Sequence, residues 1–298
     1  MPATLTHSVL VDPREAGPKP PYDATPQPMP GSEQQMQPQA DHGERSYKGS
    51  GKLQGCAALI TGADSGIGRA VALAYAREGA DVLISYLDEH EDAEQTAALV
   101  REAGRQAILA PGDITSREHC DKLVERAMKE FGRLDILVSN AAMQTVHKQI
   151  DQWDIEEFDR TYRTNVYAMF YLCRAALPKM SAGGSIIATS SVQAFQPTGQ
   201  LLAYSSTKGA IRTFIQALAE LAIKNGVRAN AVAPGPVWTP LIPSTMPPEK
   251  VKNFGKDTVI GRAAQPAELA PAYVFLASND ARYITGSVVD VTGGEQIP

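Results

Sequence analysis

The chain has 298 residues, of which 43% are hydrophobic and 20% charged, a composition typical of one globular domain with a sizeable core. Its formal net charge of -5 offers none of the clustered positive charge that binds nucleic acid or an anionic membrane surface, so we expect neither partner. No run of about 18 apolar residues and no basic-then-apolar leader occurs, which predicts a cytoplasmic protein without a membrane span.

Cysteine and histidine usage points to no redox or metal centre. The three cysteines, Cys56, Cys120 and Cys173, are an odd number without a C-x-x-C pair, so we expect buried free thiols. The five histidines are scattered without the spacing of metal ligands, and the sequence therefore predicts no metal site.

Residues 1–50 differ from the rest of the chain because they hold nine of the 21 prolines and show no sustained helical or strand period. Such a segment cannot bury enough apolar surface to fold alone, so we interpret it as a Pro/Gln-rich N-terminal arm. One interpretation is a flexible tail. The other is a tether, in which Met29, Met36 and Tyr47 dock on a neighbouring subunit while the prolines keep the entropy cost of ordering low.

From Leu53 onward, short apolar runs alternate with helical periods, as in a repeated unit of strand, crossover helix and parallel strand. The pattern predicts strands near 56–60, 81–86, 107–110, 134–139, 185–190, 227–232 and 287–291. It predicts helices over 66–78, 89–103, 116–131 and 154–177, and further helices that begin at Tyr204 and Pro266. Because crossovers between parallel strands are right-handed, we expect an α/β fold with a single-domain, Rossmann-type, doubly wound parallel sheet of about seven strands.

The stretch from Ala57 to Arg69, A-A-L-I-T-G-A-D-S-G-I-G-R, is an apolar run that breaks at glycine and restarts as a helix. Gly62 allows the tight reversal, Gly66 removes a side chain where a phosphate would be blocked, and Gly68 lets the helix pack close to the strand. Free N–H groups at the helix N-terminus then face an anion. The stretch predicts the pyrophosphate site of a dinucleotide; the alternative is a tight strand-to-helix turn without a ligand.

The segment after the second strand, residues 85–92, contains no Arg or Lys. A 2′-phosphate on the cofactor needs a cation there, whereas a free 2′-hydroxyl tolerates or prefers a carboxylate such as Asp88 or Glu89. We therefore predict NAD in preference to NADP. Two alternatives stay open: the two acids only begin a helix, or Arg69 reaches a 2′-phosphate from the first helix.

Two later strand ends face the same edge of the predicted sheet. Asp113, after the third strand, can accept a hydrogen bond from an adenine amino group while Ile114 packs on the ring; the alternative is a plain turn residue. The fourth strand ends in Ser139-Asn140-Ala141-Ala142, whose small residues permit close approach by a ligand or tight helix packing. Both positions fit a ligand at the carboxyl ends of the strands.

One polar residue interrupts the apolar stripe of the helix predicted over 154–177. A buried Asn165 must be hydrogen-bonded, because an unsatisfied amide costs about 1 to 3 kcal/mol. It either fastens the neighbouring strand or positions a water for proton movement.

A possible proton donor and its partners follow the fifth strand. Ser191 stands at the strand's carboxyl edge, and Tyr204 and Lys208 share one face of the next helix because they are four residues apart. Taken alone, such a Tyr-x-x-x-Lys pair is more often a surface pair. A nearby ammonium and a positive nicotinamide ring would favour the phenolate, and we predict a tyrosine pKa about two units below its usual value, roughly 2.7 kcal/mol.

Together these residues resemble the short-chain dehydrogenase/reductase family over about residues 53–298. The likeness lies in six motifs in the family's order and spacing: T-G-A-D-S-G-I-G from Thr61, S-N-A-A from Ser139, Asn165, Ser191, Y-S-S-T-K from Tyr204 and P-G-P-V-W-T from Pro234. One departure is Ala142, where the family usually has glycine, which predicts a slightly tighter approach of the backbone to the adenosine side.

The resemblance implies an enzyme with a dinucleotide-binding oxidoreductase domain at 51–298 that assembles as a homotetramer. It implies that Ser191 orients the substrate oxygen, that Tyr204 exchanges its proton, that Lys208 holds the nicotinamide ribose and depresses the tyrosine pKa, and that Asn165 supports a water relay. Hydride would pass between nicotinamide C4 and a carbonyl or carbinol carbon. The residues expected to bind the cofactor are Thr61, Gly62, Asp64, Ser65, Gly66, Ile67, Gly68, Tyr86, Asp113, Ile114, Asn140, Ala141, Ala142, Tyr204, Lys208, Pro234, Gly235, Val237 and Thr239.

The substrate side is expected to be mixed polar and aromatic, which suits a small alcohol, a sugar or polyol, an aldehyde or a ketone. The segment from Pro240 to Lys256 is interpreted as a mobile lid or a surface loop. The arm resembles that of bacterial general-stress oxidoreductases and plant glucose and ribitol dehydrogenase homologues. The alternatives are an NADP-preferring carbonyl reductase and a non-catalytic dinucleotide-binding scaffold. The residues expected around the substrate are Gln144, His147, Gln193, Phe195, Gln196 and Trp238.

Overall fold

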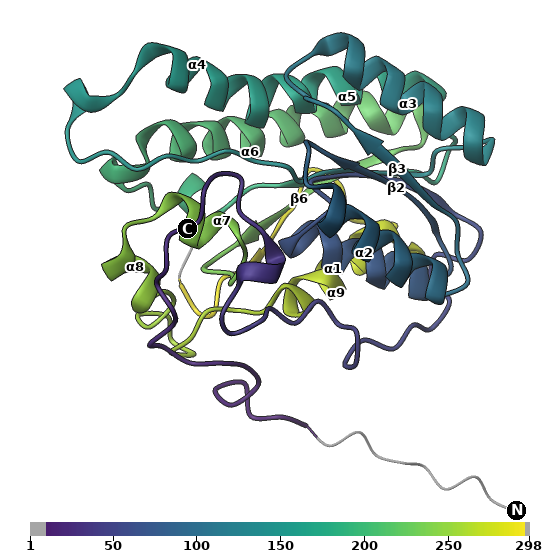
Figure 1. The fold of residues 1–298 in the computed structure, drawn as a ribbon. Coiled ribbons are helices and arrows are strands. Elements are labelled where there is room, and N and C mark those ends of the chain that lie inside the picture. The colour runs from purple at the N-terminus through teal and green to yellow at the C-terminus, as the bar shows by residue number, and fades with distance from the viewer. Residues whose placement is uncertain (1–9, 296–298) are drawn as a thin grey trace, which may run out of the picture.

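A central parallel sheet lies between two layers of helices in the computed structural model, which describes residues 10–295 (Figure 1). Among those residues, seven strands form one sheet in the order β3-β2-β1-β4-β5-β6-β7. The pairing is parallel throughout, and β1 pairs with both β2 and β4. The strand order therefore reverses direction at β1, and the ligand crevice of such a sheet lies beyond the carboxyl ends of these strands. The strands are β1 Ala57–Thr61, β2 Asp81–Tyr86, β3 Ala107–Pro111, β4 Ile136–Ser139, β5 Ser185–Thr189, β6 Arg228–Pro234 and β7 Val288–Val291.

The doubly wound fold expected from the sequence is confirmed. Helices α1, α2 and α9 cover one face of the sheet, and α3, α5 and α6 cover the other (Figure 1). Strand β1 is buried at every position, which explains why it reads as an unbroken apolar run rather than an alternating one. The helices are α1 Gly66–Arg77, α2 His90–Glu102, α3 Arg117–Phe131, α4 Ile155–Tyr162, α5 Ala168–Ala176, α6 Leu202–Ala222, α7 Leu241–Thr245, α8 Pro248–Lys252 and α9 Pro266–Ala277.

Local signals explain where the surface helices begin and end. The Ser116 side chain accepts a hydrogen bond from the His119 N–H at the start of α3, and Gly132 ends that helix in the left-handed conformation. The Asp154 carboxylate caps α4 by accepting from the N–H groups of Glu156 and Glu157. These caps are readable in the sequence, which is why the predicted boundaries lie close to the observed ones.

The long helix predicted over 154–177 is interrupted in its middle. A π-helical turn, Arg163–Tyr167, joins α4 to α5, and Asn165 lies inside it. Single π-helical turns are rare in proteins, but those that occur often lie at functional sites, because the extra residue changes the direction of the side chains in one turn.

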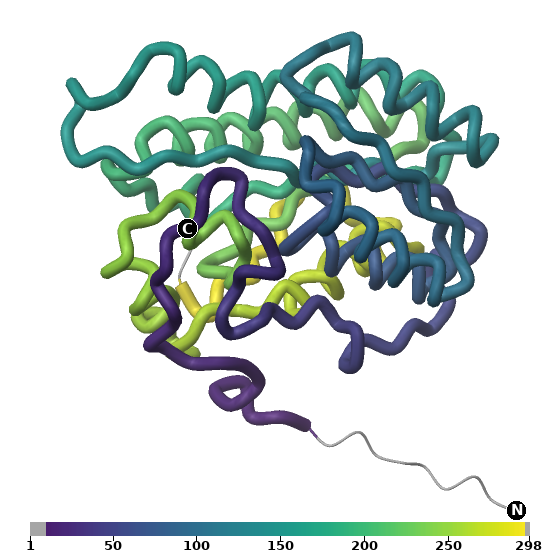
Figure 2. Tube along the Cα trace, viewed as in Figure 1, coloured from purple at the N-terminus to yellow at the C-terminus, as the bar shows by residue number. Residues whose placement is uncertain are grey.

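The arm follows its own domain rather than extending into solvent (Figure 2). Its first nine residues lie outside the described part of the chain. Met36 is fully buried and packs with Tyr22 of the arm against Trp238, Ile242 and Val251. The flexible-tail interpretation is therefore wrong for this part of the arm.

Two of the three side chains expected to dock on a neighbouring subunit are used within the chain. Met36 is buried as described, and the Tyr47 hydroxyl donates to Glu78 Oε1 at 2.6 Å. Met29 remains 53% exposed. The docking surface for both side chains is the arm's own domain: Met36 covers apolar side chains of the segment after β6, and Tyr47 binds Glu78 at the end of α1.

The cysteines are free, as expected, although Cys56 is only half-buried whereas Cys120 and Cys173 are buried. Within residues 10–295, no helix is both long and apolar enough to cross a bilayer. In the same residues, no group of three or more His, Cys, Asp or Glu side chains is placed to hold a metal ion.

Candidate active site

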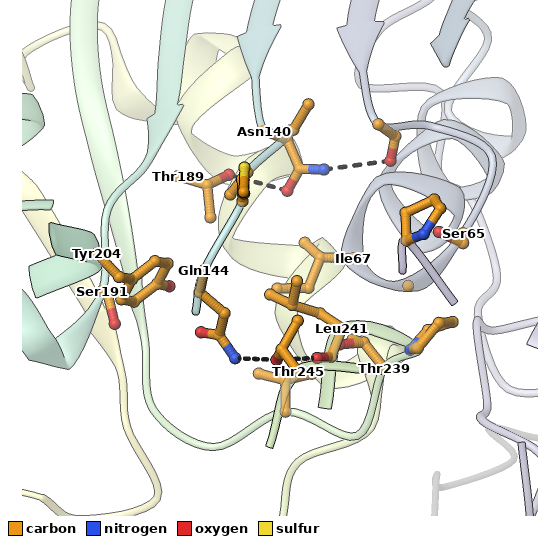
Figure 3. Close-up of a pocket in the computed structure, with 18 of the residues that line it drawn as sticks. Ser65, Ile67, Asn140, Gln144, Thr189, Ser191, Tyr204, Thr239, Leu241 and Thr245 are labelled. Carbon is orange, nitrogen blue, oxygen red and sulfur yellow. Dashed lines mark hydrogen bonds between the residues drawn. The ribbon is translucent and has the colours of Figure 1, made fainter. Parts of the chain in front are cut away.

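A cavity of about 560 Å³ opens at the carboxyl edge of the sheet, in the size range of cofactor and substrate pockets (Figure 3). It extends from the glycine turn between β1 and α1 to the start of α6. Seventeen positions around it belong to the predicted site: Gly62, Asp64, Ser65, Gly66, Ile67, Tyr86, Asp113, Ile114, Asn140, Ala141, Ala142, Tyr204, Lys208, Pro234, Gly235, Val237 and Thr239. Ser191 joins them.

Three predicted site residues stand behind the cavity wall instead of lining it. Thr61 Oγ1 accepts hydrogen bonds from the N–H groups of Asn140 and Ala141, so its hydroxyl is occupied in joining β1 to the end of β4. A Cβ on Gly68 would lie 1.9 Å from the Gly62 carbonyl oxygen, which makes Gly68 a packing position. Asn165 is the third, and its contacts are described below.

The glycine turn has the shape that an anion cradle requires. Gly62 and Gly66 both have positive φ, +62° and +50°. A Cβ on Gly62 would lie 3.0 Å from the Ala141 Cα, and one on Gly66 would lie 3.0 Å from the Thr239 Cγ2. Side chains at these positions would therefore strain the turn and fill the space beside it.

A buried polar atom without a protein partner lies at the end of the cavity formed by Ser85, Glu89 and Asp113. We call this the adenosine end, because the sequence predicts the cofactor's adenosine there. The Ser85 hydroxyl at the end of β2 is buried, lines the cavity and has no hydrogen-bond partner among residues 10–295. Buried hydroxyls are rarely left unpaired in folded proteins. Together with the glycine turn, it fits a bound dinucleotide, in which ribose hydroxyls would be available as partners.

The catalytic candidates meet where β5 and α6 converge. Ser191 lies two residues beyond β5, and its side chain lies beside that of Tyr204 in the cavity lining (Figure 3). The Lys208 ammonium nitrogen lies 5.2 Å from the centre of the Tyr204 ring, one turn further along α6. Lys208 is 2% exposed and donates to the Thr189 carbonyl at 2.7 Å. The Tyr-x-x-x-Lys pair thus lies in the cavity wall, with Lys208 buried and Tyr204 partly exposed, and is not a surface pair.

The residues of the chain do not by themselves give the lower tyrosine pKa that the sequence predicted. Burial raises the pKa of Tyr204 to about 12, although the neighbouring Ser191 side chain acts in the opposite direction. Burial likewise lowers the pKa of Lys208 to about 7, so this side chain is only partly charged near neutrality. Desolvation penalises both charged forms, and it outweighs the attraction between phenolate and ammonium that the spacing suggested.

Asn165 fastens a neighbouring strand, which is one of the two roles that the sequence left open. Its Oδ1 accepts from the Met143 N–H at 2.8 Å, and its Nδ2 donates to the Met143 carbonyl at 2.9 Å and to Thr207 Oγ1 at 3.0 Å. The amide therefore joins the extension of β4 to α6, and both of its N–H groups are used by the protein.

Asn140 forms a second junction at the sheet edge. Its Nδ2 donates to the carbonyls of Thr61 and Gly62, and its Oδ1 accepts from Thr189 Oγ1. One side chain thus connects the ends of β1, β4 and β5. The three strands that form the cavity floor are held at fixed spacing, which keeps the glycine turn and the catalytic candidates in register.

The adenosine end of the cavity is acidic. Asp64, Glu89 and Asp113 line it, and burial raises the pKa of Asp64 to about 6. Burial and a hydrogen bond with Asp88 raise the pKa of Glu89 to about 7. Arg160 also lines this end, where it pairs with Asp113 at 3.6 Å.

Arg69 is not available for a cofactor phosphate. It is buried and donates to the carbonyl oxygens of Asp64 and Asp92, with an ion pair to the Asp92 carboxylate at 3.4 Å. Its guanidinium joins α1 to α2, because the two helices bury it between them. The alternative in which Arg69 reaches a 2′-phosphate is therefore excluded for this conformation.

The substrate side agrees only partly with the prediction. Gln144 and Gln193 line the cavity, and Gln144 Nε2 donates to Thr245 Oγ1 at 2.7 Å (Figure 3). Trp238 instead stacks on Tyr22 of the arm, with ring centres 4.4 Å apart. The other expected residues that lie outside the lining are His147, Phe195 and Gln196.

The expected lid takes a definite form, and the sequence missed several lining residues. The segment after Thr239 folds into α7 and α8, and its side chains at Leu241, Ile242 and Met246 line the cavity. Met29 and Pro30 of the arm also line it. No periodic pattern marks these arm residues, and only the apolar Met29 within a polar segment is a signal that sequence reasoning could have used.

Comparison with known proteins agrees with this arrangement. A family model described as Enoyl-(Acyl carrier protein) reductase matches residues 62–296. General stress protein 39 of Bacillus subtilis is 47% identical over 266 residues, which cover 89% of this chain and 93% of that protein. Glucose and ribitol dehydrogenase of Daucus carota is 44% identical over 272 residues, covering 89% of this chain and 94% of that protein.

Solved structures with bound dinucleotide share the fold. A short chain dehydrogenase from Burkholderia cenocepacia in complex with NADP superposes with a TM-score of 0.77 at 30% identity, covering 82% of this chain and 98% of that one. A 3-ketoacyl-(acyl-carrier-protein) reductase from Brucella melitensis complexed with NADH gives a TM-score of 0.73 at 33% identity, with coverages of 81% and 98%. The chain is an oxidoreductase that uses NAD(P), and it belongs to the short-chain dehydrogenase/reductase family.

Proposed function

We propose that this enzyme transfers a hydride between NAD(H) and a small alcohol, sugar or polyol, aldehyde or ketone, with Asn165, Ser191, Tyr204 and Lys208 as its catalytic set. The observation that carries the proposal is that Ser191, Tyr204 and the buried Lys208 line the same cavity that the glycine turn borders. A non-catalytic scaffold has no chemical need for this arrangement. We further propose that residues 51–298 are the oxidoreductase domain and residues 1–50 the arm.

In this proposal each side chain has one role. The bound nicotinamide supplies the hydride acceptor or donor at C4. Ser191 donates a hydrogen bond that orients the substrate oxygen. Tyr204 takes the hydroxyl proton as an alcohol is oxidised, or returns it as a carbonyl is reduced, and a protonated Lys208 stabilises the phenolate. Asn165 acts as a positioning residue, because its contacts with Met143 and Thr207 hold the extension of β4 against α6.

The proposed preference for NAD rests on charge at the adenosine end. Asp64, Glu89 and Asp113 would repel a 2′-phosphate, and Arg160 is already paired with Asp113. An NADP-preferring carbonyl reductase is the competing proposal, since the Burkholderia structure has NADP bound. The ratio of kcat/KM for the two cofactors separates them, and a value favouring NADP by tenfold or more contradicts the NAD preference.

The proposed substrate class follows from the lining of the other end. Gln144 and Thr245 present an amide and a hydroxyl, while Leu241 and Met246 present apolar surface. Such a wall accommodates a short carbon chain with hydroxyl groups. The carrot relative, named for glucose and ribitol, makes sugars and polyols the first compounds to test.

We also propose a homotetramer in the cytoplasm. Tyr167 and Phe170 on the outer side of the α4–α5 region and Leu221 on α6 are exposed apolar side chains of the kind that subunit interfaces bury. Met29 of the arm is left exposed by its own domain. Its contact with a neighbouring subunit stays a prediction. Multi-angle light scattering of the full chain tests the assembly, and a monomer at micromolar concentration would contradict it. Cell fractionation tests the location.

The test of the activity is a screen of polyols, sugars and aldehydes that follows nicotinamide absorbance with NAD(H) and NADP(H). We expect turnover in at least one class and a loss of at least a thousandfold in kcat for Tyr204→Phe. Tyr283→Phe is the matched control, because Tyr283 is fully exposed, and it should keep wild-type activity. Retained turnover in Tyr204→Phe would refute the proposed mechanism.

A further inference from the structure

The arm contributes to the wall of the cofactor cavity. Met29 and Pro30 line it, beside the segment that follows β6. Gly31 has φ +90°, and a Cβ there would lie 2.6 Å from the Pro240 carbonyl oxygen, so only glycine allows this close approach. The Ser244 hydroxyl lies between two carbonyl acceptors, that of Pro240 at 2.7 Å and that of Pro30 at 3.2 Å. The arm is thus fixed at the point where it enters the cavity wall.

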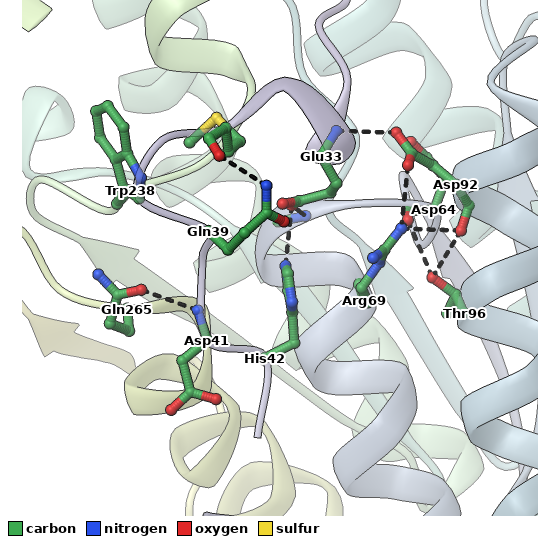
Figure 4. Close-up of polar contacts among 12 residues, drawn as sticks. Glu33, Gln39, Asp41, His42, Asp64, Arg69, Asp92, Thr96, Trp238 and Gln265 are labelled. Carbon is green, nitrogen blue, oxygen red and sulfur yellow. Dashed lines mark hydrogen bonds and ion pairs between the residues drawn. The ribbon is translucent and has the colours of Figure 1, made fainter. Parts of the chain in front are cut away.

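A carboxylate of the arm binds the glycine turn at the start of α1. Glu33 is 2% exposed, and its Oε1 accepts from the Gly66 N–H at 2.6 Å (Figure 4). The Glu33 N–H donates to Asp92 Oδ2 at 3.0 Å, which fastens the arm to α2. Ser65, the residue that precedes α1, makes no capping bond with its side chain. The first free N–H of α1 therefore has its partner in the arm and not in its own turn.

The charge of this carboxylate is balanced within the arm. His42 Nε2 lies 2.9 Å from the same Glu33 oxygen, and the other ring nitrogen contacts Glu44. Burial alone would lower the pKa of His42, but the hydrogen bonds with Glu33 and Glu44 raise it to about 9. Near neutral pH the arm therefore supplies a carboxylate ligand together with its counter-charge. A lone carboxylate at this position would repel the diphosphate of a cofactor.

We propose that residues 29–33 of the arm are part of the cofactor site, with Glu33 as the residue that positions the Gly66 amide and Met29 and Pro30 as wall against the bound dinucleotide. The inference rests on the assignment of the glycine turn to the cofactor and is independent of the substrate class. Loss of the Glu33 contact frees the start of α1 to shift, so dinucleotide affinity falls while the groups at Tyr204 stay in place. KM for the cofactor should therefore rise more than kcat falls.

The experiment titrates NADH into the full-length chain and follows nicotinamide fluorescence. We expect Glu33→Ala to raise the Kd at least tenfold and Glu33→Gln to stay within threefold of wild type, because the amide oxygen can still accept from Gly66. Met29→Ala should raise the Kd about threefold, and Met29 is exposed enough for this truncation to leave folding intact. Gln34→Ala, an exposed change in the same turn, and Tyr47→Phe, which removes an arm bond at the far end of α1, are the controls and should stay within twofold.

Each outcome decides whether residues 29–33 of the arm contribute to cofactor binding. A Kd for Glu33→Ala within twofold of wild type overturns the proposal. A rise shared by Tyr47→Phe assigns the effect to general loosening of the arm and also overturns it. If Glu33→Ala fails to fold, the Kd for NADH of Met29→Ala is compared with that of Gln34→Ala. Equal Kd values for these two variants overturn the proposal. A wild-type chain that binds neither NADH nor NADPH would instead refute the glycine turn as a cofactor site.

Discussion

The two ends of the cavity are built in opposite ways. At the catalytic end, Lys208 is buried and donates to the Thr189 carbonyl at the sheet edge, and burial disfavours the charged forms of both Lys208 and Tyr204. At the adenosine end, Glu89 and Asp113 stand on the connections that follow β2 and β3, with more water around them. Substitutions at the catalytic end should therefore change turnover and stability together. Substitutions at the acidic adenosine end should change cofactor preference and leave turnover largely intact.

The largest effect is expected at Lys208. Lys208→Met should reduce kcat at least a thousandfold, yet raise the melting temperature at pH 7. The folded pKa of about 7 lies well below that of an exposed lysine, so the unfolded chain binds more protons and wild-type stability rises from pH 7 toward pH 10. A buried lysine near its pKa costs about 4 kcal/mol at pH 7, and methionine removes that cost while losing one hydrogen bond to Thr189.

Thermal denaturation at several pH values checks this prediction. The excess stability of Lys208→Met should shrink as the pH rises, because deprotonation removes the penalty from the wild type. Lys224→Met, at an exposed lysine, should show neither the loss of turnover nor the pH-dependent gap. A variant less stable than wild type at pH 7 would mean that the charge of Lys208 stabilises the folded protein. That result would contradict the proposed cost of burying this charge at the catalytic end.

An intermediate effect is expected at Asn165. Asn165→Ala leaves the Met143 N–H and carbonyl without their partner, at a cost of about 1 to 3 kcal/mol in the free energy of unfolding. The extension of β4 then moves relative to α6, and kcat should fall about ten- to a hundredfold with little change in the Kd for NADH. Steady-state kinetics and a fluorescence titration separate these quantities. An equal loss in Asn225→Ala, whose amide makes one long bond near the surface, would deny Asn165 a specific role.

The sequence predicted the sheet, the glycine turn and the residues around Tyr204 because each leaves a local pattern: an apolar run, a glycine spacing or a four-residue period. It did not predict the arm's path, since an extended segment is held by isolated contacts such as the bond from Trp238 Nε1 to the Pro38 carbonyl. Nor did it predict the pKa of Tyr204, because the spacing reveals a neighbouring charge but not the depth of burial.

At the acidic end, a single charge reversal should change cofactor preference. Glu89→Arg places a cation on the cavity wall next to Asp88, and we expect the ratio of kcat/KM for NADP over NAD to rise at least tenfold. The kcat with NAD should change less than threefold, because the catalytic end is untouched. Glu94→Arg, on the exposed side of α2, should leave the ratio unchanged. A large loss of kcat in Glu89→Arg would show that the two ends are coupled.

The smallest effect is a pH dependence of the same preference. The pKa of Glu89 is raised to about 7 by burial and by its hydrogen bond with Asp88, and burial raises that of Asp64 to about 6. Both carboxyls are therefore mostly neutral at pH 5.5 and mostly ionised at pH 8, so the ratio of the Kd for NADPH to that for NADH should be a few-fold smaller at pH 5.5. The 2′-phosphate also loses charge below about pH 6, which would reduce the ratio by itself. Glu89→Gln keeps the phosphate's titration and removes that of Glu89, so the part of the change centred near pH 7 should vanish in this variant. If the wild type and Glu89→Gln give superimposable profiles, the carboxylate of Glu89 does not select the cofactor, and the acidity of this end serves only to begin α2.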